Sequence, residues 1–321
     1  MTQQSLLFHL LKGGIAKILN TKTKEHVETH TSRILLVMKG KESMEKILVP
    51  VDGSRSSLKA EETAVRIAGK TGATVTIFHV MQELVLGDPL PRNIHDELMD
   101  SIEQHARLIE TNALSLFREE KVKAEAKRTL SNDPAESILN QSEKVPSLIV
   151  MGASGEGILD PYALGSVTKK VVRHVTHPML IAKEVTDLLN ILVCIDGSKN
   201  SFKALSFAAE LAAKMGSNVT LLSIVDKRIY DHSPKAAEKA GQAILSRALK
   251  TLGKKKLKAE NKLEFGSPSE TIVRFAEKGN HDLIVVGSRG LGTVDRFLLG
   301  SVSDHVINRA KCSVLVVPAK D

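Results

Sequence analysis

The stretch that decides the fold is Leu283-Ile284-Val285-Val286-Gly287-Ser288-Arg289-Gly290, followed by nine residues and then Gly300-Ser301. Its leading apolar residues are typical of a short strand buried in a parallel sheet. Residues 302–307 have the apolar spacing of a helix, so the glycines lie in a loop between a strand and a helix start. Glycines let the backbone approach an anion closely, and the free N–H groups of a helix start point toward it. This order predicts a phosphate-binding loop.

The same arrangement occurs earlier in the chain. Leu148-Ile149-Val150-Met151 leads into Gly152-Ala153-Ser154-Gly155, followed by nine residues and Gly165-Ser166, with a helical pattern over residues 167–174. A strand pattern ending in an Asp-Gly-Ser turn precedes each loop, at Asp52 and at Asp196. The turns are 144 residues apart and the loops 135, so the first copy is nine residues longer. We interpret the chain as the duplication of a whole domain.

In each copy strand patterns alternate with helix patterns, which predicts a parallel sheet covered by helices on both faces. Strands are expected at residues 47–51, 74–80, 122–130, 148–151 and 179–182, and again from residues 191–195 and 219–225 onward. The predicted fold class is α/β, with two tandem doubly wound domains of five parallel strands each, at residues 46–184 and 188–321. Such sheets bind ligands at the carboxyl ends of the strands, where the strand order reverses. The turn, the end of the second strand and the glycine loop should therefore converge on one crevice.

Residues 1–45 are expected to form an N-terminal extension. Leu and Ile recur at helical spacing over residues 6–19, interrupted by Gly13-Gly14, which predicts an amphipathic helix, and residues 33–38 predict one strand. The helix either packs on the rest of the chain, which we favour, or lies on a partner or a membrane surface.

Composition restricts the classes of function. The net charge of +8 permits polyanion binding, but the lysines are spread along the chain, with one dense run at Lys254-Lys255-Lys256. This distribution favours a solvated basic surface. Tryptophan is absent and aromatic residues make up 3% of the chain, so stacking surfaces for single-stranded nucleic acid are scarce. We expect no specific nucleic-acid partner.

Cysteine usage and hydropathy favour the cytoplasm. Cys194 and Cys312 are each expected inside a strand and match no metal-ligand spacing, which indicates core packing in a reduced compartment. No apolar run approaches the roughly 18 residues that span a bilayer. The N-terminus also lacks the order of a secretory signal. We therefore expect a cytoplasmic protein without a transmembrane segment.

The Asp-Gly-Ser start of each copy and the G-x2-G-x9-G-Ser loop, complete in both, resemble the universal stress protein family in its tandem two-domain form. The resemblance covers about residues 46–321. It implies a fold related to the adenine nucleotide alpha hydrolases. It also implies ATP as ligand, with or without Mg, because members with this loop bind ATP. The last strands of the two domains, at residues 179–182 and 314–317, are expected to pair, and a further homodimer is left open.

The resemblance also implies roles for individual residues. Asp52 and Asp196 would face the adenosine end of the ligand, and they are interpreted as helix caps as well. Val80 and Ile224 would contact adenine through the backbone. Ribose and phosphates would be held by Gly152, Gly155, Gly165 and Ser166 in the first copy and by Gly287, Gly290, Gly300 and Ser301 in the second.

The two loops differ in charge. The second contains Arg289, a candidate for a charge-assisted phosphate contact, where the first has Ala153-Ser154. The spacer of the first loop contains Gly157, Asp160, Pro161 and Tyr162, which could reshape it or repel phosphate, although Asp295 and Arg296 lie at comparable depth in the second. We predict that the second site binds ATP more tightly.

No catalytic group is identified. The histidines His79, His174, His177 and His305 are interpreted as structural, and none falls in a zinc pattern. There is no Walker-type loop and no nucleophile elbow. We therefore expect a stress-response protein that binds an adenine nucleotide and acts as a nucleotide-dependent signalling module. Two alternatives stay open: a slow ATPase or phosphotransferase that uses the same loops, and an interaction protein whose nucleotide sites are empty.

Overall fold

The fold is described from a computed structural model. The structure describes residues 44–82, 91–144, 147–155, 163–290 and 299–318, all within one unit that spans Met44–Asp321. The helix and the strand expected within residues 1–45 lie outside the described residues.

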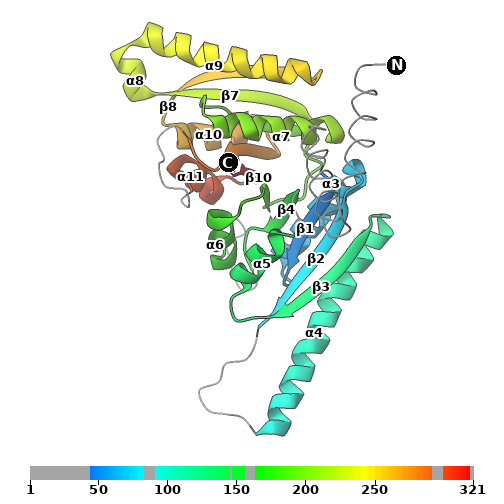
Figure 1. The fold of residues 1–321 in the computed structure, drawn as a ribbon. Coiled ribbons are helices and arrows are strands. Elements are labelled where there is room, and N and C mark those ends of the chain that lie inside the picture. The colour runs from blue at the N-terminus through cyan, green and yellow to red at the C-terminus, as the bar shows by residue number, and fades with distance from the viewer. Residues whose placement is uncertain (1–43, 83–90, 145–146, 156–162, 291–298, 319–321) are drawn as a thin grey trace, which may run out of the picture. The chain divides into compact units, whose positions relative to one another are not determined.

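Strands and helices alternate along both halves of this unit (Figure 1). The first half contains β1 (Lys46–Val51), α3 (Arg55–Thr71), β2 (Thr74–Met81), α4 (Arg92–Glu119), β3 (Ala124–Leu130), α5 (Pro134–Ser142), β4 (Leu148–Gly152), α6 (Ser166–His174) and β5 (Met179–Ala182). The second half contains β6 (Asn190–Cys194), α7 (Lys199–Met215), β7 (Asn218–Asp226), α8 (Lys227–His232), α9 (Pro234–Lys254), β8 (Ala259–Gly266), α10 (Pro268–Lys278), β9 (Leu283–Gly287), α11 (Ser301–Arg309) and β10 (Ser313–Val317).

All ten strands form one sheet, in the order β3-β2-β1-β4-β5-β10-β9-β6-β7-β8. Within each half every pair of neighbouring strands is parallel, which confirms the predicted fold class of two doubly wound five-stranded sheets. The strand order reverses at β1 in the first half, because β1 pairs with both β2 and β4, and at β6 in the second. These reversals are the positions at which doubly wound sheets bind ligands.

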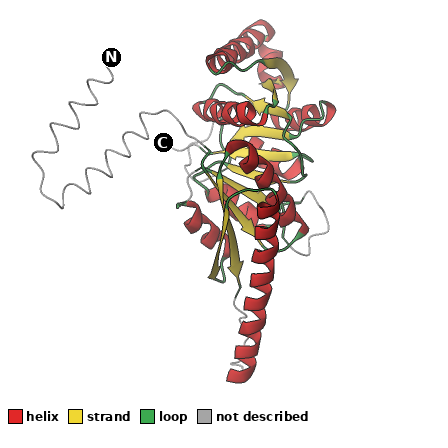
Figure 2. Cartoon of the chain, turned by 90° about the vertical axis from the view of Figure 1, so that its right-hand side faces the viewer, coloured by secondary structure: helices red, strands yellow, loops and turns green. Residues whose placement is uncertain are grey.

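Helices cover both faces of the sheet because alternate residues of each buried strand point to opposite sides. In β4, Leu148 and Val150 enter the core shared with α3 and α4, whereas Ile149 and Met151 enter the core shared with α5 and α6. Both cores run through the two halves. The N-terminal part of α4 extends beyond the sheet (Figure 2), and the buried residues of this helix begin at Ala106.

Local sequence signals set the helix ends. Ser54 caps α3 by accepting the N–H of Ser57 at 3.1 Å, and Ser198 caps α7 by accepting that of Ser201 at 3.1 Å. Serine is favoured at this position because it satisfies a backbone N–H that the helix leaves free. Helix α3 ends before Gly72, which has the left-handed backbone conformation that favours glycine at this position (φ 73°).

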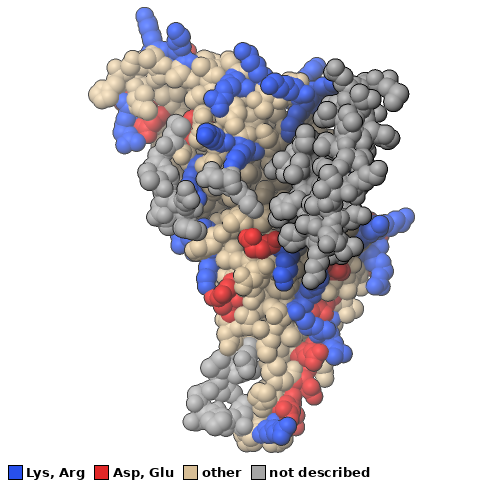
Figure 3. All heavy atoms as spheres, viewed as in Figure 1, with Lys and Arg blue, Asp and Glu red and all other residues tan. Residues whose placement is uncertain are grey.

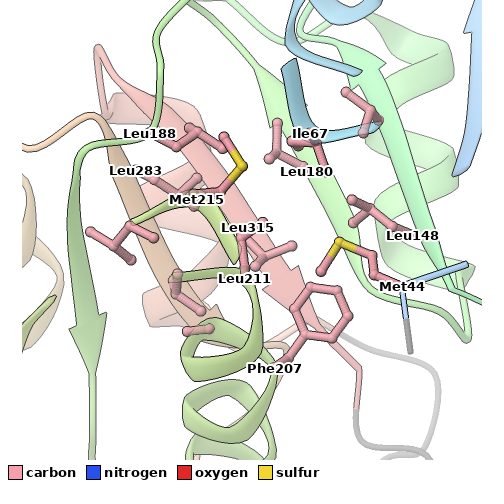
Figure 4. Packing of buried hydrophobic residues seen from close by; sticks show 14 of the residues in the cluster. Met44, Ile67, Leu148, Leu180, Leu188, Phe207, Leu211, Met215, Leu283 and Leu315 are labelled. Atoms are coloured by element: carbon pink, nitrogen blue, oxygen red, sulfur yellow. The ribbon is translucent and has the colours of Figure 1, made fainter. Parts of the chain in front are cut away.

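The two halves are joined by their last strands. β5 and β10 run antiparallel, with Ile181 opposite Val314 and Met179 opposite Val316, so the predicted pairing is observed. Figure 4 shows Leu180 and Leu315 from these strands in one packed cluster with residues of both halves. The boundary between the halves is therefore part of the hydrophobic core.

Three details differ from the sequence-based expectations. Cys312 lies just before β10, not inside a strand, whereas Cys194 is in a strand as expected, as the last residue of β6. Helix α8 was not expected, because its six residues are too few to show an apolar period. The helix after the second glycine loop extends to Arg309, two residues beyond the apolar pattern, because polar residues continue its exposed face.

Candidate functional site

A cavity of about 250 Å³ lies in the first half, at the carboxyl ends of β1, β2 and β4. The residues expected from sequence to form the first site all line it: Asp52, Val80, Gly152, Gly155, Gly165 and Ser166. They come from four separate segments of the chain, which the parallel sheet brings together at one end.

A second cavity, of about 380 Å³, lies in the equivalent position of the second half. The residues expected to form the second site all line this cavity: Asp196, Ile224, Gly287, Arg289, Gly290, Gly300 and Ser301. The duplication seen in the sequence is thus a duplication of a cavity with corresponding walls.

The aspartate of each Asp-Gly-Ser turn faces the glycine loop. Oδ1 of Asp52 accepts the N–H of Ser54 at 3.0 Å, and Oδ1 of Asp196 accepts the N–H of Ser198 at 2.9 Å. The side chains that cap the helices are those of the two serines, so the interpretation of the aspartates as helix caps is wrong. Oδ2 lies beside the loop: a Cβ built on Gly290 would stand 2.6 Å from that atom of Asp196.

The first glycine of each loop allows the strand end to touch a helix start. A Cβ on Gly152 would lie 2.6 Å from the carbonyl oxygen of Ser56, and one on Gly287 would lie 3.0 Å from the carbonyl carbon of Asn200. A larger residue at either position requires the backbone to shift. The glycines therefore set how closely the loop approaches the first turn of α3 or α7.

Two further hydrogen bonds fix the helix that follows each loop. Thr168 Oγ1 donates to the carbonyl of Gly152 at 2.9 Å, and Ser303 Oγ donates to that of Gly287 at 2.7 Å. The sequence analysis did not identify these two residues, although each copy has a hydroxyl residue two positions after its Gly-Ser pair. They hold the N-terminal turns of α6 and α11, with their free N–H groups, against the ends of β4 and β9.

The opposite wall of each cavity is apolar. Beside Val80 the first cavity is lined by Phe78, Ile138 and Met151, and beside Ile224 the second is lined by Leu222, Ile272 and Val286. Ile138 of α5 was not expected in the site, because the sequence of a buried helix residue does not show which cavity it borders. A cavity with one apolar wall and one wall of backbone N–H groups suits a ligand with a flat apolar part and an anionic part.

The two cavities differ in charge. Among the described lining residues, the second cavity has one positively charged side chain, that of Arg289, and Ser154 occupies the corresponding position in the first cavity. The spacer residues Gly157, Asp160, Pro161, Tyr162, Asp295 and Arg296 lie outside the described residues. On the face shown in Figure 3, Lys and Arg side chains are scattered over both halves.

The first half has a buried carboxyl group next to a residue that lines its cavity, and the second half has no carboxyl group at the corresponding position. Glu61 is 6% exposed and accepts a hydrogen bond from Ser57 Oγ at 2.9 Å. Burial raises the pKa of Glu61, against the lowering effect of the Ser57 hydroxyl. The corresponding residue of the second half is Leu205, which is fully buried.

The histidine of the second strand packs in the core. His79 is 8% exposed, and its Nδ1 lies 2.8 Å from the carbonyl oxygen of Val51. Across the described ranges no group of three or more His, Cys, Asp or Glu side chains is placed to hold a metal ion. None of the described helices combines the length and the apolar character that a membrane crossing requires.

These features define a tandem, doubly wound α/β protein with a glycine-loop cavity in each half. The sequence profile described as the universal stress protein family matches residues 44–183 and 188–318. The chain therefore belongs to the universal stress protein family.

The chain is similar to individual proteins of known sequence or structure. A Staphylococcus aureus (strain USA300) protein named for the same family is 33% identical over 141 residues, which cover 41% of this chain and 85% of that protein. The solved structure of a universal stress protein from Archaeoglobus fulgidus DSM 4304 matches with a TM-score of 0.71 and 24% identity, covering 87% of this chain and 100% of that one. A universal stress protein solved in complex with cAMP is 29% identical, with a TM-score of 0.33, and the match covers 40% of this chain and 94% of that one.

Proposed function

We propose that each half binds ATP or a related adenine nucleotide, and that the chain acts in the stress response as a nucleotide-dependent signalling and binding module. The observation that carries the proposal is the convergence of every expected site residue on one cavity per half. The parallel sheet explains why these segments meet at one end, but it does not dictate that an aspartate, a glycine loop and a helix start line the cavity in both copies.

The chemistry of the cavities supports an adenine nucleotide. The apolar wall around Val80 or Ile224 suits the flat base, and the aspartate oxygen beside the loop is an acceptor for a ribose hydroxyl or a base amino group. The N–H groups at the starts of α6 and α11 suit the phosphates. A magnesium ion that enters with ATP would be held mainly by phosphate oxygens.

We propose binding without fast turnover. The described residues that line the cavities include no His, Lys or Glu side chain, and their carboxylates are those of Asp52 and Asp196. One oxygen of each aspartate already accepts the backbone N–H of Ser54 or Ser198, so neither is free to serve fully as a general base or a metal ligand. Phosphoryl transfer requires a positioned nucleophile and stabilisation of the charge that develops in the transition state. A cytoplasmic location is part of the proposal, because Cys194 and Cys312 are free thiols.

The decisive experiment is the release of nucleotide from the purified full chain by heat denaturation, with identification by mass spectrometry. Calorimetric titrations with ATP, ADP, AMP and cAMP, each with Mg and with a chelator, follow. Gly300→Val and Gly165→Val each place a larger side chain in the lining of one cavity, and each should remove about one binding equivalent. No released nucleotide and no heat of binding would contradict the proposal, and product formed within minutes in a single-turnover assay would favour the slow ATPase.

A further inference from the structure

The side chain of Lys183 is 1% exposed, although it follows the last strand of the first half by one residue. Its ammonium group donates to the carbonyl of Ile307 at 2.7 Å and to that of Ala310 at 2.6 Å. These carbonyls belong to the last turn of α11 and the residue that ends it, in the other half. Burying an ammonium group is costly unless it has such partners.

Lys183 thus satisfies acceptors that the end of a helix leaves free, and a positive charge at this end is favourable for the helix dipole. The other end of α11 begins at Ser301, which lines the second cavity. The position of this cavity wall therefore depends on a side chain supplied by the first half.

The same residue is connected to the first site. Ala182, its neighbour, is paired with Gly152 of the first glycine loop. The carbonyl oxygen of Lys183 accepts a hydrogen bond from Lys59 Nζ on α3 at 2.7 Å, and the first turn of α3 contributes to the first cavity. The backbone N–H of Lys183 donates to Ser313 Oγ of β10 at 3.2 Å.

The connection is not reciprocal. By the strand registers, Gly287 pairs with Val317 as Gly152 pairs with Ala182, so the residue that corresponds to Lys183 is Pro318. Proline has no side-chain donor with which to cap the C-terminus of α6. The second half therefore supplies α6 with no support of this kind from the corresponding position.

We propose that Lys183 is a positioning residue of the second site: it fixes α11 from the first half, so the second site is complete only in the tandem chain. The ligand-binding part of this inference rests on the proposed function. The part that concerns α11 does not.

The test compares the full-length variants Lys183→Met and Lys59→Met by hydrogen exchange without nucleotide. Lys59→Met is the matched control, because it removes a lysine hydrogen bond at the same segment but leaves α11 untouched. Lys183→Met should accelerate exchange in Ser301–Arg309 about tenfold or more, since two carbonyls lose a charged donor. Ser166–His174 should exchange as in the wild type. Equal exchange of α11 in the two variants overturns the inference.

ATP titrations supply a second readout. In a Gly165→Val background, which leaves the second site, Lys183→Met should weaken ATP binding about tenfold, and Lys183→Arg should restore part of it. In a Gly300→Val background, which leaves the first site, the affinity should not change. If ATP binding is insensitive to Lys183→Met, the inference is overturned and the proposed function is not. If the wild type binds no nucleotide, the proposed function is overturned, and the exchange experiment decides on the role of Lys183. Should Lys183→Met fail to fold, Lys183→Gln is measured in the same way, and wild-type exchange in α11 then overturns the inference.

Discussion

Asp196 Oδ2 lies so close to Gly290 that a Cβ atom on this glycine would stand 2.6 Å from it. The same contact in the first half is looser, because a Cβ on Gly155 would stand 3.0 Å from Asp52 Oδ2. Within a shared plan, the second glycine loop thus packs more tightly on its aspartate.

Gly290→Ala should therefore displace either the loop or the aspartate and weaken ATP binding at the second site. Asp196 Oδ2 is the end of a flexible side chain and can turn away at little cost in stability. The ligand then loses a charged acceptor, which corresponds to roughly a tenfold loss of affinity. Gly155→Ala, the matched change, should have a smaller effect on the first site. Calorimetry on the full chain measures both, and an unchanged affinity in Gly290→Ala would show that the aspartate oxygen is not part of the site.

Gly152→Ala should destabilise the fold itself, since its Cβ would lie 2.6 Å from the backbone oxygen of Ser56. The expected loss in the free energy of unfolding is about 1–3 kcal/mol, measured by urea denaturation. Gly69→Ala on α3 is the control: nothing lies within 4 Å of its Cβ, so it should be neutral or stabilising by up to about 1 kcal/mol. Equal stabilities of the two variants would contradict the close approach of β4 and α3.

Arg289→Ala tests the predicted difference between the sites. If Arg289 contacts phosphate, the variant should lose ATP affinity by about tenfold at the second site, with less loss for AMP, because a charge-assisted hydrogen bond is removed. Ser154→Ala at the corresponding position of the first half is the matched control and should change the affinity little. An equal loss for ATP and AMP would place the arginine away from the terminal phosphates.

Glu61 should make the stability of the protein depend on pH. Burial raises the pKa of this carboxyl in the folded state above its unfolded value, so the folded state binds a proton more readily. The stability is then highest where the group is protonated in both states, and it falls as the pH rises from about 4.5 through the raised value. Glu61→Gln should remove this loss and be more stable than the wild type at pH 7.

The control for Glu61→Gln is Glu62→Gln, which removes the neighbouring and less buried carboxyl on α3. The charge of Glu62 helps to raise the pKa of Glu61, so this variant should at most weaken the pH dependence and not abolish it. Urea denaturation between pH 4 and pH 8 measures both variants against the wild type. A parallel pH profile of Glu61→Gln and the wild type would show that Glu61 does not titrate between these limits.

The repeated parts of the fold and of the site could be predicted because their signals are local. The buried strand, the glycine loop and the helix start follow one another within about twenty residues. All glycines of the second loop lie 135 residues after their counterparts in the first, which indicates a duplication. The two aspartates could be placed in the site because each ends a strand at its carboxyl end.

The roles of Lys183 and Glu61 could not be predicted from the sequence. Charged residues usually lie at the surface. Lys183 is buried because its acceptors, such as the carbonyl of Ala310, are distant in the sequence. Glu61 is buried because of the helix face on which it lies, which sequence reasoning places only approximately. Thr168 and Ser303 could have been identified, because both copies carry a hydroxyl residue at the same position after the loop.

Because β5 and β10 pair with each other, the edge strands of the ten-stranded sheet are β3 and β8. The outermost strands, β3 and β8, carry charged residues such as Lys127 and Lys262, which discourage edge-to-edge association. β5 and β10 are apolar and fully buried. The segment that joins the halves lies between β5 and β6. If it were cut and the halves separated, β5 and β10 would each become an exposed apolar edge, so a released half would associate with another copy or aggregate. The covalent linkage of the two halves thus keeps the apolar edges of β5 and β10 paired with each other and unavailable for association with other chains.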